Sequence, residues 1–449
     1  MENGIAMKAL ITLIFMTLAT WSFAQVSTDS SEVYKKKVLE SVEVDFLMSY
    51  YSQDGDNSAV GGGIGTEELT DLTPTFVVSI PLNDDDVLVI DAGISAYSSA
   101  SSSNIDPFDG DQGADPFQAS SGASRSDVYF NVSTTYRHSS DDRNQIWSGN
   151  LSFSAEYDYL SLGIGGSYTR LFNQKNTEIS IKANAYFDTW SAIYPIELST
   201  FLNGPRGGDE ADYRFDFDDY VITGNPNYNP SRFKEFDNKG RNSYSLGMTF
   251  SQILSKNMQA LLSVDLVRQD GLLSTPYQRV YFADTPDSFI ENFHLADDNE
   301  KLPDTRFKVA VGGRLNYFVN HRLTLRSYYR YYRDDWGING HTASITIPYK
   351  VSDKFTVYPN YRYYTQQAAD YFAPYNEHLS TDTYYTSDYD LSGFNSHQYG
   401  IGVGYTDIFT KAKVFSFGLK SVDLRFNYYD RSTGLSAFII SAGVKFVME

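Results

Sequence analysis

The chain has 449 residues and no cysteine, with 36 Lys and Arg against 56 Asp and Glu, so its formal net charge is −20. The lack of cysteine excludes disulfide scaffolds, thiolate metal sites and cysteine nucleophiles. The negative charge argues against a nucleic-acid partner, because phosphate binding depends on Lys and Arg. Tyr is abundant, at 36 residues, although the mean hydropathy of −0.37 is typical of a soluble protein. Tyrosine favours strands and membrane interfaces.

The chain begins with the pattern of a secretory signal peptide, which we expect to cover residues 1–24. Lys8 precedes an apolar run over residues 9–19, which is too short to cross a bilayer as a helix, and small residues stand at the cleavage positions before Gln25. A buried N-terminal helix is the alternative interpretation. Residues 25–41 are expected to form a short periplasmic segment ahead of the first strand.

Polar and apolar residues alternate along the rest of the chain, which predicts strands with one apolar and one polar face. In residues 306–319, for example, Phe307 and Val311 share one face, and Arg306 and Lys308 share the other. About sixteen such segments are expected: 42–53, 68–81, 87–99, 127–138, 145–156, 160–172, 178–190, 241–254, 258–270, 305–319, 322–334, 341–350, 355–366, 397–408, 417–430 and 435–447.

The connections between these segments alternate between short polar turns and a set that includes five long loops, at 54–67, 100–126, 191–240, 271–304 and 367–396. Short turns at one end and long loops at the other are typical of an outer-membrane barrel, whereas a soluble sandwich would place long loops at both ends. We therefore predict an all-β fold, a transmembrane antiparallel β-barrel of about 16 strands over residues 42–447. It has short periplasmic turns and long extracellular loops, in the outer membrane of a Gram-negative cell. Pro348 and Pro359 are expected to interrupt two neighbouring strands.

Four runs in the chain resemble an uncharacterised family of Gram-negative outer-membrane proteins, catalogued as a domain of unknown function. They are residues 65–71 (GTEELTD), 78–83 (VSIPLN), 91–97 (DAGISAY) and 139–144 (SSDDRN). The similarity extends over essentially the whole mature chain. It implies an outer-membrane barrel and no assigned site residues. Because members of the family are often encoded beside a flavin-attaching transferase, it also implies a connection with envelope redox chemistry.

The polar face of the strands lines the lumen of a barrel, and its most coherent cluster is basic. By alternation, seven cations face inward and form a candidate solute-binding wall: Arg306, Lys308, Arg314, Arg326, Arg330, Arg362 and Arg425. Inward acids are expected elsewhere, including Asp265 and Asp423. A basic stripe opposite an acidic one would orient or select an anionic solute. The alternative is a closed lumen in which these charges pair with each other and with loops folded inward.

Barrel closure predicts contacts between the first and last strands, because the sheet must leave no free edge. Glu43 and Asp45 are then expected to face Lys445 at the seam. The apolar and aromatic pattern that ends at Phe446 resembles the signal recognised by the outer-membrane assembly machinery.

The long loops are acidic, and one of them carries hard oxygen ligands that suit Ca²⁺, namely Asn104, Asp106, Asp109, Asp111 and Asp115. The spacing does not match a known calcium loop, so a solvated acidic loop is the alternative, and no other cofactor is expected. Acidic surface loops also suit divalent ions that bridge lipopolysaccharide. The six histidines show no metal-ligand spacing, His378 is expected at the surface, and we expect no enzymatic activity.

Two functions fit this sequence. The first is a porin-like or transport channel for small polar or anionic solutes. The second is a plugged structural or docking barrel that scaffolds a periplasmic or surface protein partner, with a role in envelope redox chemistry as a further reading. The redox role would need a cofactor-carrying partner, because the chain has no haem-attachment cysteines and no flavin fingerprint.

Overall fold

A computed structural model describes residues 37–97, 127–202, 217, 221–237, 239–290, 293–407 and 410–448. The chain divides into two units, residues 1–37 and 38–449, and the fold described below belongs to the second. The expected signal peptide and the candidate calcium ligands at 104–115 lie outside the described residues.

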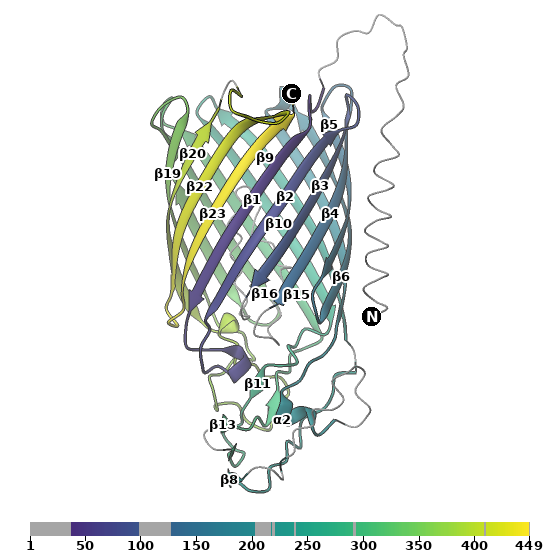
Figure 1. The fold of residues 1–449 in the computed structure, drawn as a ribbon, viewed down its shortest axis with the longest axis vertical. Helices are drawn as coiled ribbons and strands as arrows, with labels where there is room; N and C mark the ends of the chain where they lie inside the picture. The colour runs from purple at the N-terminus through teal and green to yellow at the C-terminus, as the bar shows by residue number, and fades with distance from the viewer. Residues whose placement is uncertain are drawn as a thin grey trace, which may run out of the picture. The chain divides into compact units, whose positions relative to one another are not determined.

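Sixteen long antiparallel strands pair in chain order and close into a barrel (Figure 1). They are β1 (Glu43–Asp54), β2 (Leu69–Pro81), β3 (Asp86–Tyr97), β4 (Asp127–Ser139), β5 (Gln145–Ala155), β6 (Tyr159–Phe172), β7 (Thr177–Trp190), β9 (Gly240–Ser255), β10 (Met258–Gly271), β15 (Thr305–Phe318), β16 (Thr324–Asp334), β17 (Asn339–Thr346), β19 (Phe355–Gln366), β20 (Phe394–Thr406), β22 (Phe417–Arg431) and β23 (Ser436–Met448). The predicted fold class is confirmed.

The seam between β1 and β23 closes the sheet. The two strands pair along their whole length, from Glu43 opposite Val447 to Asp54 opposite Ser436. Closure satisfies the backbone N–H and C=O groups of both strands, which is the condition for a sheet to stand in hydrocarbon.

Alternate residues of the strands face outward and form an apolar belt. Phe76, Leu151, Leu262, Ile401 and Leu424 are 50–62% exposed, which is unusual for large apolar side chains unless lipid covers them. Within the described residues, no helix is both long and apolar enough to cross a bilayer.

Pro348 divides the strand predicted at 341–350. β17 ends at Thr346, and pairing with β19 resumes over the short β18 (Tyr349–Lys350). Proline has no N–H to donate to the ladder, so the interruption falls where the sequence indicated. Pro359 lies inside β19, opposite Ile401.

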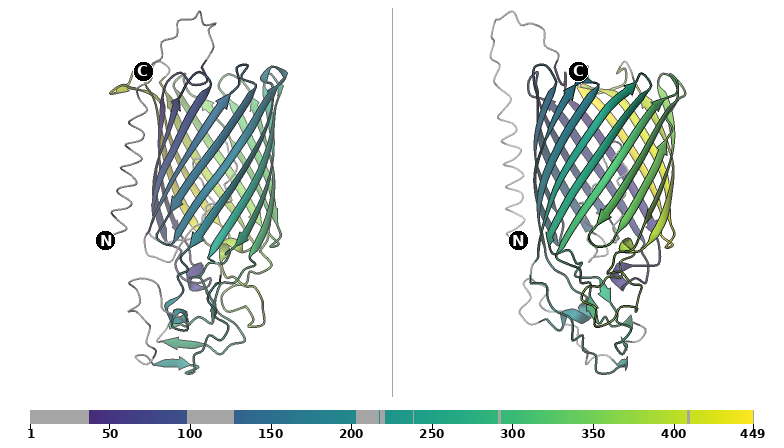
Figure 2. Two further views of the ribbon diagram at one scale, coloured as in Figure 1. Left: turned by 90° about the vertical axis from the view of Figure 1, so that its right-hand side faces the viewer. Right: turned by 180° about the vertical axis from the view of Figure 1, so that it is seen from behind.

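One end of the barrel, which we call the turn end, carries only short connections, together with η2 (Asn173–Lys175) and β21 (Lys413–Val414). The opposite, loop end carries four long loops, 55–68, 191–239, 272–304 and 367–393, and the described parts of these loops pack against one another (Figure 2). We call them the cap. Its short elements are η1 (Ala59–Gly61), α2 (Ile196–Ser199), β8 (Ile222–Gly224), β11 (Arg279–Val280), β12 (Ser288–Ile290), β13 (Phe293–His294), β14 (Asp298–Asn299) and η4 (Tyr389–Leu391).

The cap has an apolar core of its own. Tyr194, Leu198 and Phe233 of one loop pack with Tyr281 and Ala296 of the next. A second cluster joins Val280 and Phe282 to Tyr385 of the loop at 367–393. Loops that bury aromatic side chains against each other in this way are held in one arrangement rather than left in solvent.

Candidate functional site

The structure places the predicted basic wall on inward-facing positions. On β15, Arg306, Lys308 and Arg314 alternate with the exposed, outward-facing Phe307 and Leu315. Neighbouring strands add the remaining members: Arg326 and Arg330 on β16, Arg362 on β19, and Arg425 on β22.

Two members of the wall are neutralised by carboxylates on the same part of the lumen. Arg306 donates from Nε to Asp334 at 2.9 Å and lies 4.2 Å from the centre of the Trp336 ring. Arg425 donates to Asp423 at 2.8 Å. Charge-assisted bonds of this kind hold both guanidinium groups in fixed positions.

Three other members have no such partner. Among the described residues, Lys308, Arg330 and Arg362 have neither a hydrogen bond nor an ion pair, and Lys308 is only 9% exposed. Arg330 lies within electrostatic range of both Lys308 and Arg362. Asp265 on β10 also acts on Arg330, but from beyond the 4.0 Å of an ion pair. Uncompensated cations on an inner wall raise the local concentration of anions.

Tyrosines stand between these cations. The strand register sets Arg314, Tyr328, Ser344, Arg362, Gln398 and Tyr429 in one row across β15 to β22. The next row toward the loop end holds Gly312, Arg330, Thr342, Tyr364, Ser396 and Arg431. We call Arg314, Tyr328, Arg330, Arg362, Tyr364 and Tyr429 the Arg–Tyr band.

Inward-facing glycines let two of these rings lie along the wall. A Cβ on Gly312 would stand 3.4 Å from the Tyr328 hydroxyl, and one on Gly340 would stand 3.1 Å from the Tyr364 hydroxyl. Both rings therefore cover the backbone of a neighbouring strand, a packing that glycine permits.

Burial of inward-facing side chains shows that the cap covers the loop end of the lumen. Gln53, Gln269 and Ile439, which face inward near the loop end, are at most 6% exposed. Lys182 and Arg326 face inward nearer the turn end and are exposed. The described part of the cap therefore covers the loop end, and the Arg–Tyr band lies on its turn-end side.

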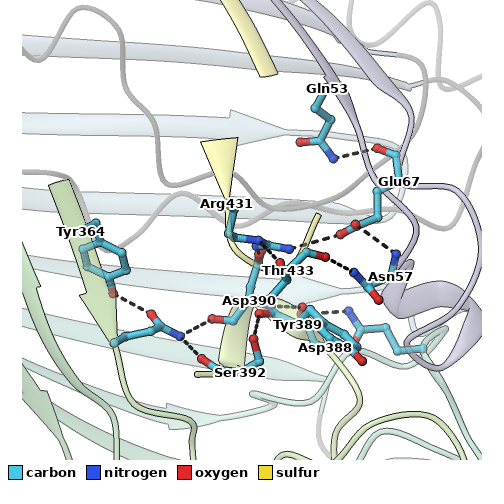
Figure 3. A network of polar contacts seen from close by, with 12 residues as sticks. Gln53, Asn57, Glu67, Tyr364, Asp388, Tyr389, Asp390, Ser392, Arg431 and Thr433 are labelled. Carbon is cyan, nitrogen blue, oxygen red and sulfur yellow. Dashed lines mark hydrogen bonds and ion pairs between the residues drawn. The ribbon is translucent and has the colours of Figure 1, made fainter. Parts of the chain in front are cut away.

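Arg431, the last residue of β22, ties the cap to the barrel wall (Figure 3). Its Nη1 donates to Asp390 at 2.5 Å, its Nη2 to Glu67 at 3.4 Å, and its Nε to the Thr433 hydroxyl at 2.6 Å. Its side chain is only 3% exposed. One buried guanidinium thus holds two different loops, and we call this group the latch.

Amide side chains of the wall add to the same attachment. Gln366 donates to the carbonyl oxygens of Asp390 at 2.9 Å and Ser392 at 2.6 Å, and accepts from the Tyr364 hydroxyl at 2.6 Å. Gln53 donates to the carbonyl of Glu67 at 2.8 Å. Tyr364 therefore belongs to the Arg–Tyr band and also contacts the latch.

The interior of the cap holds carboxyl groups as well. Glu300 accepts from Thr386 at 2.5 Å and from the Thr275 N–H at 2.7 Å, and burial raises its pKa to about 8. Burial also raises the pKa of Asp388, and the nearby Asp390 adds to the rise. Because buried carboxyl groups with raised pKa values favour the protonated form, we expect the packing of the cap to weaken as the pH rises.

Two residues of the cap and latch were missed or misread from sequence. His378, expected at the surface, is 4% exposed and contacts the Thr386 carbonyl, because its loop folds back on the cap; that prediction was wrong. Arg431 was not among the predicted site residues, because the predicted strand stopped one residue earlier. Its inward phase, shared with Arg425, was the signal that identifies it.

The seam residues lie together at the turn end. Lys445 is 2.8 Å from Glu43 and 3.2 Å from Asp45, and Lys420 also contacts Glu43 at 2.7 Å. Phe446 lies next to them on the outward face of β23, opposite Val44. In the described part of the chain, no three His, Asp or Glu side chains are grouped to hold a metal ion.

No curated protein matches the chain in sequence. Among solved structures, a bacterial polysaccharide outer membrane secretin is similar at 9% identity, with 91% of this chain and 98% of that chain covered and a TM-score of 0.44. A BenF-like porin from Pseudomonas fluorescens Pf-5 is similar at 8% identity, with 91% and 100% covered and a TM-score of 0.37. OmpT of Vibrio cholerae, with loop L8 deleted, is similar at 10% identity, with 90% and 100% covered and a TM-score of 0.36.

The family comparison covers nearly the whole chain. The model of the family described as "Protein of unknown function (DUF3570)" matches residues 9–437. With its closed barrel and lipid-facing belt, the chain is an outer-membrane β-barrel that belongs to the DUF3570 family.

Proposed function

We propose that this barrel is a gated channel for small anionic solutes, described here with its extracellular cap closed. The observation that carries the proposal is the pair of inward guanidinium groups without ion pairs among the described residues, Arg330 and Arg362. A charge removed from bulk water is costly unless something compensates it. A passing anion supplies that compensation, whereas a cation is repelled.

In this proposal the gate is the cap. Solutes that reach the band from the turn end leave through the loop end only if the loops at 55–68 and 367–393 move. Both loops are attached to the wall through Arg431, so the latch is the contact whose release would open the path.

Planar-bilayer recording of the purified chain tests this function. We expect small, rare currents from the native protein and larger ones from Arg431→Gln, with a reversal potential in a KCl gradient that favours chloride. Arg330→Gln combined with Arg362→Gln, in the same background, should bring the chloride-to-potassium permeability ratio close to one.

Arg326→Gln is the matched control, because Arg326 lies on the same wall but outside the band. It should leave the ratio unchanged. Silence from both the native chain and Arg431→Gln would overturn the channel, and cation preference would overturn its selectivity.

The cap itself favours a second candidate, a docking barrel that holds a protein partner. A loop domain with its own aromatic core offers a stable surface, which an open pore does not need. A partner that co-purifies in equal amount from detergent, and is lost when loop 367–393 is shortened, would support this function. A lone monomer that conducts would count against it.

A further inference from the structure

Two guanidinium groups of the Arg–Tyr band, those of Arg330 and Arg362, come from adjacent inward-facing rows of the wall. Arg330 and Arg362 act on each other electrostatically, and the phenols of Tyr328 and Tyr364 lie within electrostatic range of both. Neither Arg330 nor Arg362 has an ion pair among the described residues. Two like charges held together on a half-buried wall repel, so the pair favours a counter-charge.

The strand register sets the distance between the Cα atoms of Arg330 and Arg362. Arg362 stands opposite Ser344 and Tyr328, and Arg330 stands one row closer to the loop end, two strands away. With strands about 4.8 Å apart and about 3.3 Å per residue, the two Cα atoms are about 12 Å apart. Guanidinium groups that start about 12 Å apart on one wall can each take one end of a ligand a few bonds long, with an oxyanion at each end.

The surroundings indicate what kind of ligand fits. The guanidinium fork matches a carboxylate in a planar, bidentate way, and the Tyr328 hydroxyl can donate a further hydrogen bond. Two carboxylates act on this site: Asp265 acts on Arg330 and Tyr328 from beyond ion-pair distance of Arg330, and Asp334, which is paired with Arg306, acts on Tyr364. A ligand with one charge would leave one guanidinium uncompensated.

We propose that Arg330 and Arg362 form a binding site for a short solute with two carboxylate groups. Each guanidinium takes one carboxylate, and Tyr328 and Tyr364 contact the segment between them. The site deepens the proposed function by naming the class of anion that the lumen selects.

Calorimetric titration of the full chain in detergent tests the site without any transport. Succinate is the probe; butyrate, of the same length with one carboxylate, and sulfate, with two charges on one centre, are the comparisons. We expect succinate to bind at least tenfold more tightly than either, and 0.5 M KCl to weaken its binding.

Variants locate the site on the wall. Arg330→Gln and Arg362→Gln should each weaken succinate binding at least tenfold. Arg362→Lys should bind succinate more tightly than Arg362→Gln but less tightly than the native chain. Arg326→Gln should bind succinate like the native chain. Thermal unfolding of each variant shows that a loss of binding is not a loss of fold.

Each other outcome overturns the proposal. If succinate and butyrate bind equally well, the second carboxylate is not recognised. If sulfate binds as tightly as succinate, the site recognises a double charge on one centre and not two separate carboxylates. Binding that survives both Gln substitutions places the ligand elsewhere. If the protein binds succinate but passes no current, the proposed channel function is wrong and the binding site stands. If it passes anion current without a preference for succinate, the binding site is wrong and the channel function stands.

Discussion

The cap and the lumen wall treat their charged residues in opposite ways. In the cap, Arg279 lies 2.7 Å from Glu197 and Lys301 lies 2.5 Å from Asp298, and both acids are almost fully buried. On the wall, Arg330 and Arg362 face the lumen without an ion pair. Buried and paired charges fix a structure, whereas accessible and unpaired ones remain available to a ligand. The contrast separates the cap, where paired charges fix the structure, from the wall, where we propose that a solute binds.

Removing the latch should have the largest effect of the changes considered, because it takes away the buried ion pairs that hold the cap on the wall. Arg431→Gln leaves Glu67 and Asp390 without their shared cation, and loss of one partner of a buried ion pair costs about 3–5 kcal/mol. We expect the cap to open in a large fraction of molecules. Limited proteolysis within 367–393, which should accelerate at least tenfold, measures the opening.

Arg425→Gln is the control for the latch, because Arg425 lies on the same strand and pairs with Asp423 where both are about one-third exposed. Its cleavage rate should stay near that of the native chain. Equal protection of loop 367–393 in Arg431→Gln would show that the aromatic core alone holds the cap.

Raising the pH from 6.5 to 8.5 should loosen the cap without any mutation. Burial raises the pKa of Glu300 to about 8, from about 4.5 in water, so the closed cap binds a proton that the open one releases. Stability from such a group is present at low pH and is lost as the pH rises through about 8, at up to about 1.4 kcal/mol per pH unit. Hydrogen exchange of the cap loops measures the change.

Glu300→Gln isolates that carboxyl, since the amide keeps the shape and cannot ionise. Exchange in the cap should then depend less on pH over the same range. Burial lowers the pKa of His378, which moves its titration away from the alkaline side of this range. An unchanged pH profile in Glu300→Gln would assign the effect to Asp388 or other groups.

A smaller effect is expected on the wall away from the cap, at Gly402. The Tyr358 ring lies against this inward-facing glycine, where a Cβ would overlap the ring, and the Tyr358 hydroxyl bonds to Asp423. Gly402→Ala should force the ring away and cost about 1–3 kcal/mol of barrel stability. Urea unfolding in lipid vesicles measures it.

The matched substitution Gly149→Ala enters open space on the outward face of β5, so it should be nearly neutral. Equal costs for the two glycines would mean that strand propensity, rather than the ring, determines the result. Unchanged cap proteolysis in both variants would show that the wall and the cap respond independently.

The smallest effect is expected at the seam. Lys445→Met removes contacts to Glu43 and Asp45, but these groups are partly exposed, and such ion pairs contribute about 0–1 kcal/mol. Urea midpoints should differ little from that of the native chain. A large loss would show that the seam charges are needed for closure itself.

The sequence predicts the barrel better than the cap, for a physical reason. Strand alternation records which side faces lipid, so all sixteen long strands and the inward phase of Arg330 and Arg362 follow from local pattern. Loops carry no such period, and their structure depends on contacts between distant segments. His378 and Arg431 show this, because the burial of one and the role of the other arise only when the loop at 367–393 meets its neighbours.

The closed seam also limits the order of folding. Asp45 and Lys445 meet although they are 400 residues apart. Contacts with such long sequence separation form late, because a large loss of chain entropy precedes them. Until β23 is in place, β1 remains an open edge that can pair with the wrong chain. The last strand of this protein is therefore the one that decides whether the first fourteen hairpin contacts become a finished barrel or the start of an aggregate.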